Sequence, residues 1–188
     1  MKLNLILTIV VVLALFTINN VYAQEGTIFP NLDGKTVSGK NITFPQDTKG
    51  KITLIGVAFS KKSDKLLKPW FNPTYETFMA EPDPNSFFPT TAYDVNVYFV
   101  GMLKGLAKKA SGKIESSMNK KLDPKLHKHT VLSPVKLKDY KKVLNFGAKD
   151  QPYFYILDST GKIIYATSGA YSERKMEEIT DAIEKITE

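Results

Sequence analysis

The sequence contains no cysteine among its 188 residues. Thiol–disulfide exchange and thiol peroxidase chemistry both need a sulfur nucleophile, so this chain cannot perform either reaction by itself. No disulfide can form, and the folded state must therefore be held together by packing and hydrogen bonds. We expect no redox activity from this protein.

Other absences narrow the function classes further. Histidine occurs only twice, and there is no Gly-x-Ser-x-Gly turn of the kind that presents a hydrolase nucleophile. The basic segment 104–142 contains a single aromatic residue, Tyr140, whereas sites for single-stranded nucleic acid combine basic residues with several stacking aromatics. We therefore expect neither a nucleic-acid partner nor a cofactor.

The first 23 residues have the pattern of a secretory signal peptide. Met1-Lys2 gives a positive start, and an almost wholly apolar run, Leu3–Ile18, is followed by a cut site after Ala23. This predicts export to the periplasm or the cell exterior, with one domain over residues 24–188. A retained membrane anchor is the alternative, although the run is shorter than the ~20 residues of a spanning helix.

The net charge of +7 is concentrated in one segment. Residues 104–142 contain twelve lysines and three acidic residues, a net charge of +9, whereas residues 143–188 carry a net charge of −3. This basic segment predicts a solvated helix face, with peripheral association with an anionic membrane surface as the functional alternative.

The first half of the chain predicts a β-hairpin followed by a buried strand and a helix. Asp33-Gly34 is a hairpin-turn signal between two short strands, and the continuous apolar run 52–59 is typical of a central strand. From Asp64 the apolar spacing becomes helical, and Pro69 lies near the helix start or kinks it.

The second half predicts alternating strands and helices. A strand over 93–101 precedes a lysine-rich helix whose apolar side includes Met102 and Leu103. A short helix ends at Gly147, residues 152–166 form a hairpin, and Ser172 caps the last helix. The order predicts an α/β sandwich with a central mixed sheet flanked by helices, an N-terminal hairpin and a lysine-rich helical insertion.

Two stretches resemble thioredoxin-like redoxin domains. They are "GKITLIGVAFSKKSDKLL", at the first central strand, and "DQPYFYILDSTGKIIYATSG", near the C-terminus. The resemblance covers most of residues 28–186 and implies a thioredoxin-like three-layer sandwich. It also implies a cis peptide bond before Pro152, with Gln151 offering backbone groups to an extended peptide.

A narrower similarity links the chain to the thioredoxin-like assembly factor ten family of the mitochondrial ATP synthase. It rests on "LLKPWFNPTYETF", with Trp70 and Pro73, and on Ser168-Gly169 before the last helix. The resemblance implies a protein without a redox pair that acts as an assembly chaperone. The export signal departs from that family's pattern, so the client stays open.

The resemblance also indicates where redox cysteines would stand. An ungapped alignment places Lys62 and Lys65 in those positions, and a shift of two residues places Ser60 and Ser63 there. With Lys61, Trp70, Gln151, Pro152, Ser168 and Gly169, these residues form our predicted polypeptide-binding groove.

The sequence is compatible with two enzymatic alternatives. A serine nucleophile at Ser60 or Ser63 would need a nearby general base, whereas a helix-capping role needs none. His127 and His129 would lie on one face of a strand and form a weak candidate for a metal pair. The favoured expectation is an exported, non-catalytic chaperone or assembly factor with a polypeptide client.

Overall fold

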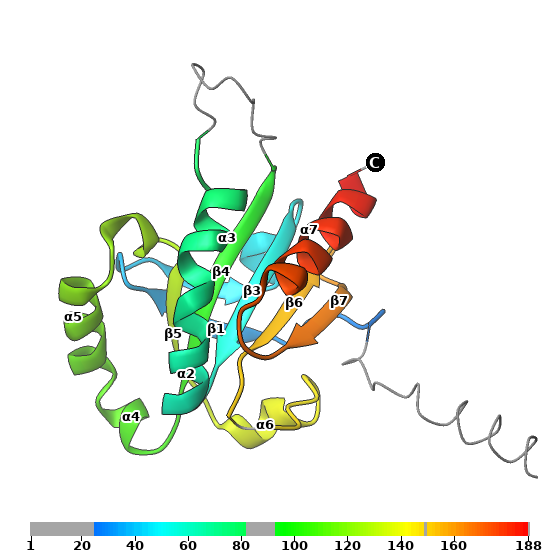
Figure 1. Cartoon of the computed structure of the whole chain (residues 1–188). Helices are drawn as coiled ribbons and strands as arrows, with labels where there is room; N and C mark the ends of the chain where they lie inside the picture. Colours follow the sequence, from blue (N-terminus) through cyan, green and yellow to red (C-terminus); the bar gives the residue numbers. More distant parts are fainter. Residues whose placement is uncertain (1–24, 82–92, 149, 188) are drawn as a thin grey trace, which may run out of the picture.

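The computed structural model describes residues 25–81, 93–148 and 150–187. A seven-stranded mixed sheet forms the centre of the molecule, in the order β2-β1-β5-β4-β3-β6-β7 (Figure 1). Its strands are β1 (Leu32–Thr36), β2 (Asn41–Phe44), β3 (Ile52–Ala58), β4 (Val95–Leu103), β5 (Thr130–Pro134), β6 (Tyr153–Leu157) and β7 (Ile163–Ser168). The predicted signal peptide, 1–23, lies outside the described residues. No helix within the described ranges is long and apolar enough to cross a bilayer.

The apolar run predicted as a central strand is β3. It pairs in parallel with β4, from Ile52 opposite Val95 to Ala58 opposite Gly101. On its other side it pairs antiparallel with β6. Every residue after Ile52 is buried, which explains why the sequence here is continuously apolar rather than alternating.

Helices lie on both faces of the sheet, as the sequence predicts (Figure 1). One face carries α2 (Lys61–Leu67), the 3-10 turn η2 (Lys68–Trp70), α3 (Phe71–Phe78) and α7 (Glu173–Thr187). The other carries η1 (Gln46–Thr48) and α6 (Leu137–Lys141). The segment between β4 and β5 contains α4 (Leu106–Lys109), α5 (Ser111–Lys121) and η3 (Pro124–Leu126).

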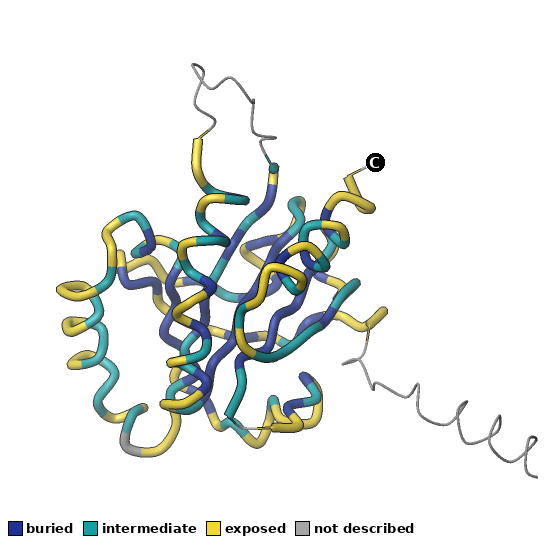
Figure 2. Tube along the Cα trace, viewed as in Figure 1, coloured by how far each residue is buried: buried dark blue, intermediate teal, exposed yellow. Residues whose placement is uncertain are grey.

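Two apolar cores are separated by the sheet, and buried residues concentrate along its strands (Figure 2). Trp70 lies at the centre of the first core, where its ring packs 4.1 Å from the ring of Phe154. Tyr155 lies in the second core against Phe29. Adjacent β6 residues thus serve opposite cores, as strand geometry requires.

The predicted turn at Asp33-Gly34 is wrong, because both residues lie inside β1. The hairpin turns at Gly39 instead, which has a φ of +96°. Gly34 is required by packing: a Cβ there would lie 2.4 Å from Val131 Cγ1 and 3.1 Å from the Leu132 carbonyl oxygen. The Asp-Gly pair therefore reports a close approach of β1 to β5 rather than a turn.

The lysine-rich helix begins later than predicted. Met102 and Leu103 still belong to β4, because β5 pairs with that strand up to Leu103 opposite Pro134. The helix that follows is divided into α4 and α5. A helix-like apolar spacing therefore included two strand residues.

Other boundaries differ in smaller ways. Pro69 does interrupt its helix, through the 3-10 turn η2. The short helix α6 ends at Lys141 rather than at Gly147, and Asn145, with a φ of +48°, takes the left-handed conformation expected of a stop. The hairpin of β6 and β7 and the last helix are confirmed, with Ser172 accepting a hydrogen bond from the Lys175 amide.

We predict that Gly34→Ala lowers the free energy of unfolding by about 2 kcal/mol, because the added methyl overlaps Val131 and backbone at once. Urea unfolding followed by far-ultraviolet circular dichroism measures this change. Gly112→Ala is the control, since nothing lies within 4 Å of a Cβ at that helical site. It should leave stability unchanged or raise it by up to about 1 kcal/mol. Equal effects of the two substitutions would contradict the packing explanation.

Candidate functional site

The junction between β3 and α2 is closed by two serines. Ser60 is the N-cap of α2 and accepts a hydrogen bond from the Ser63 amide at 3.1 Å. The Ser63 hydroxyl accepts from the Ser60 amide at 2.9 Å and from the Phe59 amide at 3.0 Å. This is a reciprocal capping box, and it satisfies amides that the strand and the helix leave unpaired. The capping role considered from the sequence is therefore confirmed.

This hydrogen bonding leaves the serines poorly suited to nucleophilic chemistry. The Ser63 side chain is fully buried and also donates to the Ser60 carbonyl at 3.0 Å, so its donor and acceptor capacity is used. Neither histidine supplies a base here. His127 Nε2 hydrogen-bonds the Leu122 carbonyl at 3.0 Å, and His129 Nδ1 hydrogen-bonds the Val97 carbonyl at 2.9 Å.

The predicted histidine pair is also not a strand face. His127 ends the 3-10 turn η3, and β5 begins only after His129. The described residues contain no group of three or more side chains suited to holding a metal. The period-two argument failed because β5 starts at Thr130, one residue after His129 and three residues after His127.

The structure brings the second predicted element next to the corner. Lys62 Nζ lies 3.7 Å from a carboxylate oxygen of Asp150, which precedes Gln151 and Pro152. Gln151 Nε2 donates to Ser168 Oγ at 3.0 Å, and the Gly169 amide donates to the Pro152 carbonyl at 2.9 Å. We call this the corner surface and define it as Ser60, Lys61, Lys62, Lys65, Gln151, Ser168 and Gly169.

The predicted cis bond before Pro152 is wrong. Among the described residues the cis peptide bond is Phe44–Pro45, so the Gln151–Pro152 bond is trans. Cis and trans X-Pro bonds differ by only about 0.5–1 kcal/mol, so the sequence near a proline does not decide the isomer. Pro152 is buried, and its carbonyl still receives the Gly169 amide.

Trp70 is buried beneath the corner surface and contacts Gly169. Its side chain is fully buried, so it does not contact solvent. Its Nε1 donates to the Gly169 carbonyl at 3.3 Å, and its ring packs edge-on against Tyr171. Gly169 itself has a φ of +114°, a conformation that favours glycine. Trp70 is therefore a positioning residue rather than a binding residue.

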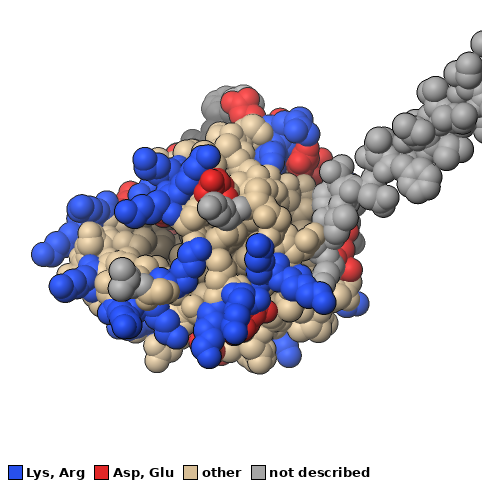
Figure 3. Space-filling view, turned by 90° about the horizontal axis from the view of Figure 1, so that it is seen from below, with Lys and Arg blue, Asp and Glu red and all other residues tan. Residues whose placement is uncertain are grey.

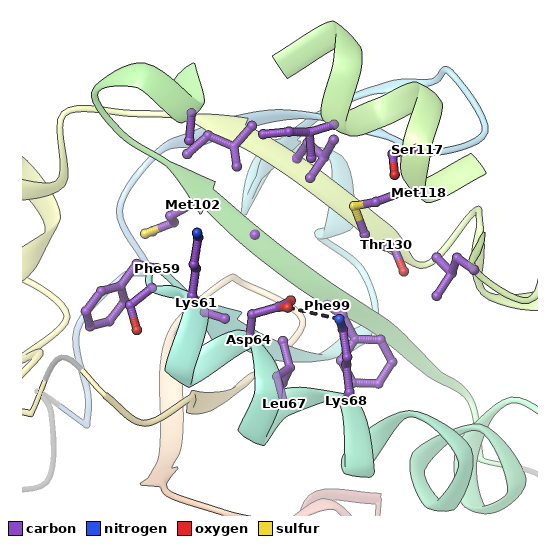
Figure 4. A pocket seen from close by; sticks show the side chains of 18 of the residues that line it. Phe59, Lys61, Asp64, Leu67, Lys68, Phe99, Met102, Ser117, Met118 and Thr130 are labelled. Atoms are coloured by element: carbon purple, nitrogen blue, oxygen red, sulfur yellow. Dashed lines mark ion pairs between the residues drawn. The ribbon is translucent and has the colours of Figure 1, made fainter. Parts of the chain in front are cut away.

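A hollow lies beside α2, where Lys61 lines it while the next residue, Lys62, faces Asp150. It has a volume of about 650 Å³ and is bounded by α2–α3, the strands β4 and β5, and α4–α5. Figure 4 shows Leu67 and Lys68 on one side of it and Met118 of α5 on the other. Sequence reasoning missed this hollow, although Ile114, Met118 and Leu122 recur every four residues and mark an apolar helix stripe.

Lysines surround this part of the molecule. They gather on the side where α4 and α6 lie, with few acidic side chains among them (Figure 3). Lys61 lines the hollow, whereas the next residue, Lys62, faces Asp150. Consecutive residues of α2 therefore lie on different sides of that helix. Lys65 is exposed on the same helix.

We predict that Ser63→Ala lowers the free energy of unfolding by about 1–2 kcal/mol, since it leaves buried amides of Phe59 and Ser60 unpaired. Guanidinium unfolding measures this effect. Ser116→Ala, at an exposed site of α5, should change stability by less than about 0.5 kcal/mol. A neutral Ser63→Ala would show that the capping box is not stabilising.

Stability should also depend on His129. Burial lowers its pKa, opposed by the hydrogen bond to the Val97 carbonyl and reinforced by Lys128. As pH falls below the ordinary histidine pKa of about 6.5, the unfolded chain binds more protons than the folded one, so stability falls. We expect His129→Gln to reduce the loss of unfolding free energy between about pH 7 and pH 5.5. An unchanged loss would contradict this assignment.

Comparisons with solved structures identify the fold. The chain is similar to the thioredoxin domain of a thiol-disulfide oxidoreductase from Bacteroides vulgatus, with a TM-score of 0.53 and 17% identity over 85% of this chain and 97% of that one. An exposed lipoprotein thioredoxin from Streptococcus pneumoniae gives a TM-score of 0.53 and 15% identity, over 83% and 99% of the two chains. A member of the Sco family of cytochrome c oxidase assembly proteins gives 0.52 and 11%, over 84% and 92%.

At these identities the likeness shows the fold alone, and it confirms the predicted thioredoxin-like α/β sandwich. No curated protein matches the sequence. A family model does, however: that of the ATP10 protein matches residues 15–186. The match spans nearly the whole chain, so the chain belongs to the ATP10 protein family.

Proposed function

We propose that this protein is an exported, non-catalytic assembly factor that holds a polypeptide client against the corner surface. The observation that carries the proposal is the serine capping box. Thioredoxin-like oxidoreductases use this junction for a redox pair, as the resemblance implies. Here two serines hydrogen-bonded to each other and to the backbone occupy it, while the neighbouring Gln151 turn is retained.

The charges at the corner surface suit a polar or acidic segment of a client. The Lys62 side chain is 69% exposed, and its ion pair with Asp150 is a loose one, with 3.7 Å between Nζ and the carboxylate oxygen. Exposed pairs of this kind contribute about 0–1 kcal/mol, so an acidic client residue can compete for the ammonium group. Gln151 and Ser168 add side-chain hydrogen-bonding groups at the end of β6 and β7.

Membership of an assembly-factor family supports the non-catalytic role, and the signal-like first 23 residues support export. The net charge of +9 over residues 104–142 supports a peripheral position at an anionic membrane surface. An envelope assembly factor at such a surface would meet membrane-protein clients. The client's identity is left open.

Site-specific photo-crosslinking in the native cell tests the proposal. A benzophenone amino acid placed at Lys62, Gln151 or Ala170 should form a discrete adduct with the same polypeptide. Adding Lys62→Glu to the Gln151 probe should reduce that adduct several-fold, because the substitution reverses the charge presented to the client.

The controls carry the probe at Lys40 and Lys162, which are exposed turn residues away from the corner surface. They should give no such adduct. Absence of an adduct from all three test positions, or the same adducts from test and control positions, would contradict the proposed site.

A further inference from the structure

Helix α5 stands away from the sheet. It has no buried residue, and Ile114 and Met118 are only half-buried although they face the hollow. An amphipathic helix packed directly on a sheet would bury this stripe. One ion pair links the helix to the sheet: Lys35 Nζ of β1 lies 2.8 Å from Glu115 Oε1. An apolar space therefore remains between α5 and the strands.

The floor of the hollow is apolar and comes from alternate strand residues. Phe99, Gly101 and Leu103 of β4 line it, together with Thr130 and Leu132 of β5. Thr130 is paired opposite Phe99 and Leu132 opposite Gly101, so these side chains share one face. The floor runs along β4 for five residues.

The volume of the hollow favours a single chain-like ligand. At roughly 30 Å³ per non-hydrogen atom, the share of a water molecule in the liquid, 650 Å³ holds about twenty atoms. Two turns of an α-helix, about 11 Å long and at least 10 Å across, would need on the order of 850 Å³. Hollows of this size are typical small-molecule sites.

The charges around the hollow favour an anionic group on that ligand. Lys61, Lys68, Lys104 and Lys121 line it, and Asp64, which pairs with Lys68 at 3.1 Å, is the one acidic residue among its lining residues. Four positive charges and one negative charge give a local net charge of +3.

Thr130 supplies an unusual polar group inside the hollow (Figure 4). The residue is 3% exposed, and its Oγ1 is one of two buried side-chain polar atoms in the described ranges that lack a hydrogen-bond partner. A buried hydroxyl without a partner is destabilising, so a ligand oxygen that bonds it would be favoured. Lys68 and Lys121 line the same cavity as Thr130.

We propose that this hollow binds a single-chain fatty acid. The carboxylate lies near the ammonium groups of Lys68 and Lys121. It accepts a hydrogen bond from Thr130 Oγ1, which is buried in the free protein and turns toward the hollow when the ligand binds. The acyl chain runs along β4 toward Leu103 and Ala107. The hollow shares Ser60 and Lys61 with the corner surface but none of Gln151, Ser168 and Gly169. The two tests change different residues, so either proposal can fail without the other.

Fluorescence titration of the purified protein with cis-parinaric acid tests the proposal. Binding should be saturable and should be displaced by palmitate but not by hexadecyltrimethylammonium, which has a similar chain and the opposite charge. Lys121→Gln should weaken binding about fivefold. Lys120→Gln, which makes the same charge change one residue away and outside the hollow, should weaken it less than about twofold.

The threonines give an independent readout. Thr130→Val should weaken parinarate binding about fivefold while leaving the free protein as stable or more stable, because it removes an unpaired hydroxyl. Thr74→Val removes the other unpaired buried hydroxyl, which does not line the hollow, and should change stability alone.

Three outcomes would overturn the proposal. The first is no saturable binding of parinarate. The second is a result that indicates general electrostatic attraction to the protein surface. Either Lys120→Gln and Lys121→Gln weaken parinarate binding equally, or the protein binds only to anionic phospholipid vesicles. The third is displacement of parinarate by a leucine- and glutamate-rich peptide but not by palmitate, which would assign the hollow to a polypeptide.

Discussion

The complete burial of β3 is the constraint on which the rest of the structure depends. The strand is paired on both edges and covered on both faces, so every residue after Ile52 is buried. Gly56 allows β6 to pack closely on the strand, since a Cβ there would lie 2.8 Å from the Phe154 ring. Where the chain leaves this enclosed strand, the amides of Phe59 and Ser60 need hydrogen-bond partners. Ser60 and Ser63 supply them and start α2 in the same step.

Helix α2 then divides the surface at the end of the sheet into two parts. One side faces the Asp150–Gln151 turn through Lys62, and the other faces the hollow through Lys61 and Leu67. Trp70 fixes this arrangement, because its indole donates to the Gly169 carbonyl while its ring packs on Phe154. The helix position, the turn after β7 and the core are thereby coupled through one buried side chain.

The absence of sulfur limits the chemistry of the corner, where α2 starts beside the Gln151 turn. Thiolates need exposure and a lowered pKa to react, whereas the Ser63 hydroxyl is buried and fully hydrogen-bonded. The exposed groups at the corner include the Lys62 ammonium group and the Asp150 carboxylate. The lysines of α4 and α5 are exposed, as the prediction of a solvated helix face expects, and Lys104 and Lys121 also line the hollow.

Much of the fold could be predicted from local patterns. The apolar run of β3, the Gly161 hairpin and the spacing of Met176, Ile179 and Ile183 in α7 each carry a signal that packing then reinforces. The corner could be located as well, because a polar break after a buried strand predicts a helix cap. These features depend on neighbours in sequence, and propensity and periodicity report them directly.

Tertiary structure decided the features that depend on distant residues. Gly34 is needed because β5, about a hundred residues later in the chain, packs closely against it. Met102 and Leu103 belong to a strand because β5 pairs with them. The hollow exists because α5 has no residue buried against the strands, and this depends on where the segment between β4 and β5 is placed. The sequence by itself determined where the chain can be strand, helix or cap, whereas contacts between remote segments decided which surfaces meet and which spaces stay open.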